Sequence, residues 1–169
     1  MAKPYSPFSG RVYDVQFDKI AAKIKGQMAA LLKKTAESCL LNIVNHEPAP
    51  FLTGSYIASH RVGINAEDTS DLVFNDVGTL SLESARIRAM AELSKLENIK
   101  VDDTVYISNS VGYSTKYGYS WARNVEYQGW EGKKGGGRGS YLVYEQAALK
   151  AINDIPKHVQ FIKVSGEGI

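Results

Sequence analysis

The sequence predicts an α+β domain in which a long N-terminal amphipathic helix and further helices pack on a small, mainly antiparallel β-sheet. Apolar residues recur at steps of three and four from about residue 14 to about residue 45, which is the period of an amphipathic helix. Two shorter segments, 56–65 and 104–109, alternate apolar and polar residues as half-buried strands do. Further helical patterns lie between and after these strands, so we expect helices to cover one face of the sheet.

The chain is long enough for one domain with its own core. It has 169 residues, of which 44% are hydrophobic and 22% charged, close to the average for soluble globular proteins. This composition excludes a disordered chain, a collagen and a membrane-spanning segment of roughly 18 apolar residues. A formal net charge of +2 is too small to indicate a dedicated nucleic-acid-binding protein.

Residues 1–13 are expected to form an extended N-terminal arm, because they contain two prolines and a glycine. Residues 14–169 are expected to form a single α+β domain with a Gly/Lys-rich loop at 131–140. The arm lacks the apolar segment of a signal peptide, and the single cysteine, Cys39, excludes an intrachain disulfide. We therefore expect synthesis in a reducing cytoplasm and interpret Cys39 as a small buried hydrophobic residue.

The first helix is expected to present one continuous apolar face. Because a helix of about 30 residues is long for a small domain, we expect it to lie across a sheet or against neighbouring subunits. Its opposite face is rich in lysine, and Pro48 and Pro50 follow its end. The apolar face consists of Phe17, Ile20, Ile24, Met28, Leu31, Leu32, Thr35, Cys39, Leu40 and Ile43.

Local patterns predict the remaining elements. Thr53-Gly54-Ser55 is typical of a turn, and Ser81 is a suitable N-cap for the second helix. Pro156 is expected to end the third helix because proline lacks a backbone donor. The expected elements after the first helix are a strand at 56–65, an acidic loop at 66–77 with a possible short strand at 72–74, a helix at 81–96, a strand at 104–109, a helix at 141–155 and a short strand at 159–164.

No group of residues indicates catalysis, a metal site or a cofactor site. The histidines at 46, 60 and 158 are far apart and lack a second ligand at a metal-binding spacing. Asp102 and Asp103 are adjacent, so on an extended strand their side chains would point apart and make a poor acid–base pair. We therefore expect a protein that is not an enzyme and that needs no cofactor.

Two segments near the C-terminal third have more than one interpretation. Residues 113–130 are dense in tyrosine and contain both tryptophans, which suits a protein interface, a core, or stacking on single-stranded bases. Residues 132–139 are rich in glycine and basic residues, but Lys134 stands where a phosphate-binding P-loop requires serine or threonine. We expect a mobile loop there, or a basic loop that contacts a DNA backbone without sequence preference.

Charge is distributed unevenly along the chain. Residues 1–34 contain seven basic and two acidic residues, whereas residues 66–103 contain four basic and nine acidic residues. The two segments are either the solvated faces of two helices or opposite ends of a head-to-tail contact between copies. Head-to-tail contacts close into rings when the rotation between copies fits.

Two stretches of sequence resemble a known family. The first is Pro50-Phe51-Leu52-Thr53-Gly54-Ser55-Tyr56-Ile57-Ala58-Ser59-His60-Arg61-Val62, directly after the long helix. The second is Val105-Tyr106-Ile107-Ser108-Asn109-Ser110-Val111-Gly112-Tyr113, followed by Trp121-Ala122-Arg123-Asn124-Val125-Glu126-Tyr127-Gln128-Gly129. They resemble the head–tail joining, or tail-completion, neck proteins of tailed bacteriophages, similar to the phage lambda minor tail protein Z type. The chain departs from that family's pattern at Tyr56, where leucine is usual, at Trp121, where tyrosine is usual, and at the inserted Gln128.

The resemblance implies a structural virion protein without catalysis, located at the head–tail neck and made in the host bacterial cytoplasm. Copies would form a ring, of six or twelve subunits, that joins portal-side connector or adaptor proteins to tail-tube or terminator proteins around the DNA channel, with no membrane involved. The alternatives are a tail terminator that caps the tail tube and a nucleic-acid-binding module. The residues expected to shape docking loops are Thr53, Gly54, Tyr113, Trp121, Glu126 and Tyr127, and those expected to face a partner or DNA are Lys133, Lys134 and Arg138.

Overall fold

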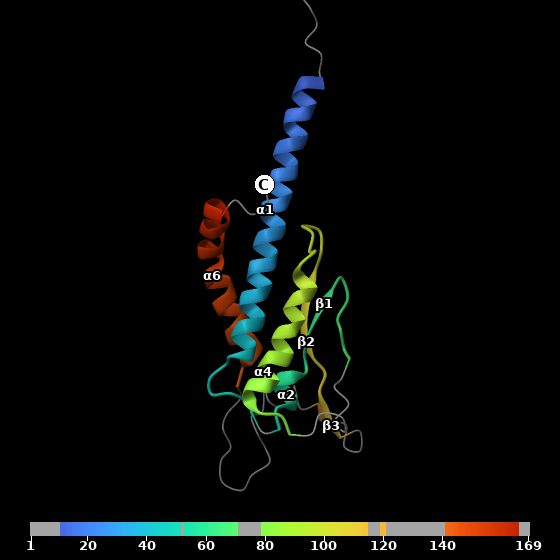
Figure 1. Cartoon of the computed structure of the whole chain (residues 1–169), viewed down its shortest axis with the longest axis vertical. Helices are drawn as coiled ribbons and strands as arrows, with labels where there is room; N and C mark the ends of the chain where they lie inside the picture. The colour runs from blue at the N-terminus through green and yellow to red at the C-terminus, as the bar shows by residue number, and fades with distance from the viewer. Residues whose placement is uncertain (1–10, 52, 71–78, 115–118, 121–140, 166–169) are drawn as a thin grey trace, which may run out of the picture.

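The fold is built around one long helix, α1 (Arg11–Val44), which forms the long axis of the molecule (Figure 1). The computed structural model describes residues 11–51, 53–70, 79–114, 119–120 and 141–165, and it describes no side chains at 11–16, 112–114, 119–120 and 163–165. Within these residues a long N-terminal helix, further helices and a two-stranded antiparallel sheet confirm the predicted α+β class. The helix begins three residues before the expected start and ends where expected, ahead of the two prolines.

The C-terminal half of α1 lies in the core. Leu40, Ile43 and Val44 are fully buried, and Ala36 is nearly so. Helix α6 (Val143–Ser165) runs antiparallel to α1 on one side, and α4 (Leu82–Met90) lies on the other side (Figure 1). The N-terminal half of α1 extends past all of these elements (Figure 1).

The two strands of the main sheet pair as expected, but the first strand is shorter than the sequence pattern predicts. Strand β1 (His60–Ile64) pairs antiparallel with β2 (Val105–Asn109), with His60 opposite Asn109 and Ile64 opposite Val105. The prediction of strand at 56–59 was wrong, because Ser55–Ala58 forms a one-turn helix, α2, that precedes β1. All of α2 is buried, so the alternation of residue types there does not correspond to a buried and a solvated face.

The second helix confirms its predicted N-cap. The Ser81 hydroxyl accepts a hydrogen bond from the Ser84 backbone N–H at 3.1 Å, which satisfies one of the open donors of the first turn. The α-helix then continues as a 3₁₀-helix, η1 (Ala91–Leu96), to the predicted end. Ala85 and Ala89 are fully buried, and Leu96 completes the same core cluster.

The third helix corrects two predictions. Helix α6 continues through Pro156 to Ser165, so both the expected end at 155 and the expected strand at 159–164 were wrong. Proline in a helix interior costs about 3 kcal/mol, yet Val159 and Ile162 lie beyond it at helical spacing and pack toward α1. Burial of these side chains offsets the lost hydrogen bond. A second, short pair is formed by β3 (Gly112–Ser114) and β4 (Tyr119–Ser120), whereas the possible strand at 72–74 lies outside the described residues.

Candidate functional site

The turn predicted at Thr53 and Gly54 is present and joins two parts of the core, and its role in docking stays a prediction. Gly54 has φ 81 and ψ −12, a left-handed conformation, and it precedes α2. The Thr53 hydroxyl donates to the Ser55 hydroxyl at 3.0 Å, and the Thr53 carbonyl accepts from the Leu80 N–H at 2.9 Å. A Cβ added at Gly54 would lie 2.8 Å from the Leu80 Cβ. Glycine is therefore required both by the backbone angle and by the close approach of the segment before α4.

The other predicted docking residues are less completely placed. Tyr113 lies in β3, of which only the backbone is described. The remaining predicted residues lie outside the described part of the chain, so their roles stay predictions. They are Trp121, Glu126, Tyr127, Lys133, Lys134 and Arg138.

The buried histidine is a structural group. His60 is fully buried, its Nδ1 lies 2.8 Å from the Ile57 carbonyl oxygen, and its ring contacts the rings of Tyr56 and Tyr144 at 5.1 and 5.8 Å between centroids. Burial lowers the pKa of His60 to about 4, so the imidazole is neutral at physiological pH. The Asn109 amide lies 3.5 Å from Nε2 and donates at 2.7 Å to the Tyr56 carbonyl, which links both strands and α2.

A polar network holds the segment after β1 against η1. Lys95 forms ion pairs with Asp68 at 3.0 Å and Glu92 at 2.6 Å, and Glu92 also accepts from the Val62 backbone N–H at 2.9 Å. Hydrogen bonds from Ser70 and from Lys95 hold the pKa of Asp68 well below its usual range. Every charge in this network has a partner within it, so it stabilises the fold and offers no reactive group. In the part of the chain with described positions, no cluster of three or more His, Cys, Asp or Glu is arranged to hold a metal ion.

The most unusual surface of the described molecule is the apolar stripe, which we define as Phe17, Ile20, Ile24 and Met28. These side chains are 67, 55, 50 and 53% exposed, although they form a continuous apolar face of α1. Helices gain most of their stability from packing an apolar face, so an unpacked half-helix with this pattern is typical of a surface that a partner covers. The N-terminal part of α1 extends beyond the other elements (Figure 1), whereas Ile24 and Met28 border a hollow whose other wall is α6.

Lysines accompany the stripe. Lys23 and Lys25 lie roughly 100° to either side of its centre on a helical projection, and Lys19 lies behind it. None of the three forms an ion pair with a described residue. Farther along, Lys34 pairs with Glu37 at 3.5 Å and lies over the Phe161 ring at 4.9 Å, where α6 begins to cover α1. The exposed half of α1 therefore presents an apolar face with positively charged flanks.

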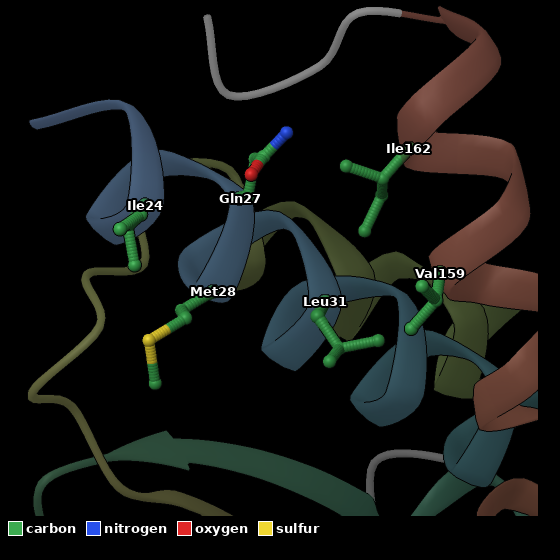
Figure 2. A pocket seen from close by; sticks show the side chains of 6 residues that line it. All are labelled: Ile24, Gln27, Met28, Leu31, Val159 and Ile162. Carbon is green, nitrogen blue, oxygen red and sulfur yellow. The ribbon is translucent and has the colours of Figure 1, made fainter. Parts of the chain in front are cut away.

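The stripe leads into a hollow between α1 and α6, which has a volume of about 200 Å³. Figure 2 shows Val159 and Ile162 extending from α6 toward α1, whereas Ile24 and Met28 point away from α6. Leu31 and Gln27 complete the described lining, and Gln27 is the one polar side chain among these described residues.

A second opening, which we call the groove, continues along the same face of α1. It has a volume of about 240 Å³ and lies between α1, β2 and α6. Five of its seven lining side chains from the helices are small, the exceptions being Leu32 and Ile152, and Ile152 is 57% exposed. Burial raises the pKa of the Cys39 thiol, so Cys39 is protonated at neutral pH and unactivated. The groove is lined by Leu32, Thr35, Ala36, Cys39, Val105, Ile107, Ala148, Ala151 and Ile152.

Sequence reasoning identified the apolar face of α1 but not its division into a buried half and an exposed half. That division depends on where α6 and the β1–β2 pair end, which is a property of the tertiary structure. The groove was missed entirely, because its lining comes from three elements that are distant in sequence. The exposed apolar residues of α6, such as Leu149 and Phe161, were detectable as helical positions outside its buried face.

Comparisons with protein-family models, curated proteins and solved structures find no match to this chain. Among the described residues, no helix combines the length and the apolar character that crossing a membrane requires.

Proposed function

We propose that the chain is a structural protein whose copies assemble through α1 into a ring, and that this ring lies at the head–tail neck of a tailed bacteriophage. The observation that carries the assembly role is the apolar stripe on the exposed half of α1. A contiguous apolar surface on an extending helix is typical of protein association, because covering it removes apolar area from water.

The openings beside the stripe favour association over chemistry. Catalytic pockets combine apolar walls with converging polar and titratable groups. The hollow is lined by apolar side chains and Gln27, and the groove by apolar side chains with Thr35 and Cys39. Among the described residues, neither lining contains an acid or a base that would activate the Cys39 thiol.

The charge distribution supports head-to-tail contacts between copies. The lysines that flank the stripe have no ion-pair partner among the described residues, and Glu67, Glu97 and Asp102 elsewhere on the surface likewise form no ion pair with described residues. Opposite charges on different surfaces of one chain attract when copies meet head to tail. Such a heterologous contact closes into a ring at a suitable rotation.

The position at the phage neck rests on the resemblance of segments 50–62, 105–113 and 121–129 to the neck proteins. In that position the ring would join portal-side connector proteins to tail-tube or terminator proteins around the DNA channel. The neck proteins that the chain resembles have a long first helix, then a Thr-Gly turn, and a last helix. The proposal is supported by α1, the Thr53-Gly54 turn and α6, which follow the same order here. No observation here favours the tail terminator or the nucleic-acid-binding module.

Native mass spectrometry of the purified chain over a series of salt and protein concentrations, with negative-stain images of the same samples, tests the assembly role. We expect closed rings that dissociate as salt rises, because screening weakens the charged part of the contact. A monomer at every concentration would overturn the ring. Immunogold labelling of phage particles that contain the chain tests the position, and label away from the neck would overturn it.

A further inference from the structure

We propose that the apolar stripe of one copy docks in the groove of a second copy. This inference rests on the proposed self-assembly and names the two surfaces that meet. The stripe supplies large side chains, Phe17, Ile20 and Ile24, and the groove supplies the space for them.

The two surfaces are complementary in side-chain size. Seven helix residues line the groove, and five of them are small: Thr35, Ala36 and Cys39 on α1 and Ala148 and Ala151 on α6. The other two are Leu32 and Ile152. Two elements interdigitate at the packing density of a protein core when large side chains on one element face small side chains on the other. Stripe against stripe would instead place large side chains against large ones.

The two surfaces also match in length. Phe17 to Ile24 spans seven residues at steps of three and four, and Leu32 to Cys39 spans seven residues of the groove wall. Each distance is about 11 Å along a helix axis, which is two helical turns. Two turns of the stripe therefore fit along the full length of the groove wall on α1.

Charge complementarity favours the same pairing. Asp102 lies three residues before Val105, which lines the groove, so the chain between them spans at most about 10 Å. Glu97 precedes Asp102 in the same connection between η1 and β2. Both carboxylates are exposed and form no ion pair with a described residue. Docking brings one flank of the stripe, which carries Lys25, toward these carboxylates, whereas a stripe-to-stripe pair would bring together the lysines of both copies.

Cys39 in the groove allows a direct test by disulfide cross-linking between two different variants. One partner is Ile20→Cys combined with Cys39→Ser, and the other is the unmodified chain, whose single thiol is Cys39. After mixing and mild oxidation near pH 8.5, we expect a cross-linked heterodimer, with peptide mass spectrometry joining position 20 to Cys39. The matched control is Ala22→Cys with Cys39→Ser, which places the new thiol on the opposite, exposed face of α1.

The outcomes separate this inference from the proposed function. Cross-linking at position 20 well above the position 22 control supports the docking. Rings without this cross-link, or a disulfide between two copies of position 20, would overturn the docking and leave the ring intact. The cross-link found in a simple two-fold dimer would support the docking and overturn the ring. A monomeric chain that gives no cross-link would overturn both.

Discussion

The two halves of α1 have the same apolar periodicity and opposite surroundings. In the C-terminal half, Leu40, Ile43 and Val44 are fully buried by α6, α4 and the strands. In the N-terminal half, Phe17 and Ile20 have more than half of their surface exposed. The difference separates two uses of one helix, since the buried half stabilises the fold and the exposed half is available for association.

The largest effect is expected from a cavity in the buried half. Leu40→Ala removes a fully buried side chain from the main core cluster and should lower the free energy of unfolding by about 2–5 kcal/mol. Urea denaturation followed by circular dichroism measures this change. Ile20→Ala in the exposed half should change the stability of the dilute, unassembled chain by less than about 0.5 kcal/mol. Equal losses in the free energy of unfolding for both variants would contradict the division of α1 into a buried half and an exposed half.

A second prediction concerns the pH dependence of the core beside α1. His60 has a pKa of about 4 in the fold against 6.5 when unfolded, so the unfolded chain binds the proton more tightly. The contribution of neutral His60 is therefore complete above pH 6.5 and is lost as the pH falls from 6.5 toward 4, by about 3 kcal/mol in total.

Urea denaturation at steps between pH 7 and pH 4 measures this loss. His60→Gln should flatten the slope in that interval, whatever its effect on stability at pH 7. The lowered pKa values of Asp68, Asp103 and Asp154 reduce stability only below about pH 5, so the part of the interval between pH 7 and about pH 5 reports on His60. An unchanged slope in His60→Gln would assign the acid sensitivity to another group.

A third prediction tests the turn that connects α1 to the core. Gly54→Ala places a side chain at φ 81 and 2.8 Å from the Leu80 Cβ, so it should lower the free energy of unfolding by about 2 kcal/mol. Thermal unfolding of the variant measures the loss. Because the turn is remote from the stripe in sequence and buried, any ring that forms below the melting temperature should keep its wild-type size.

The sequence allowed prediction of those elements whose pattern reflects local physics. The repeat of α1 and the cap at Ser81 depend on neighbours three and four residues away, and both are present. Prediction from the sequence failed where tertiary packing determines the conformation of a segment. Ser55–Ala58 alternates like a strand but is buried on all sides as a helical turn, and Pro156 is tolerated because residues beyond it pack on α1.

The same distinction applies to the candidate site. The stripe is readable from the sequence as an apolar face, since it lies on one helix. Its exposure, and the groove beside it, depend on the relative lengths of α1, α6 and β2. No periodicity within a single element contains that information.

A fourth prediction separates association from stability. Ile20→Asp places a charge in the centre of the stripe and should weaken self-association at least tenfold, because docking would bury an unpaired carboxylate in an apolar groove. Sedimentation velocity over a dilution series measures the change. The matched control, Ala22→Asp, adds the same charge to the exposed opposite face and should leave association close to wild type. Similar losses in both variants would show that charge, and not the stripe, controls association.

The smallest effect is expected from the charges around the contact. Asp102→Lys removes an exposed carboxylate near the groove and should weaken association by roughly two- to fivefold at low salt, the range of a surface ion pair. Combining it with Lys25→Glu should recover most of that loss, because the reversed charges again attract. Both effects should vanish near 0.5 M salt, where the Debye length is only about 4 Å.

Glu83→Lys is the matched control for this charge reversal, since Glu83 is equally exposed but lies in the first turn of α4, away from the groove lining. It makes the same change in net charge, so a loss equal to that of Asp102→Lys would reflect total charge rather than a specific contact. Failure of the double variant to recover would exclude Lys25 as the partner of Asp102. Lys23, on the other flank of the stripe, would then be the lysine to reverse in combination with Asp102→Lys.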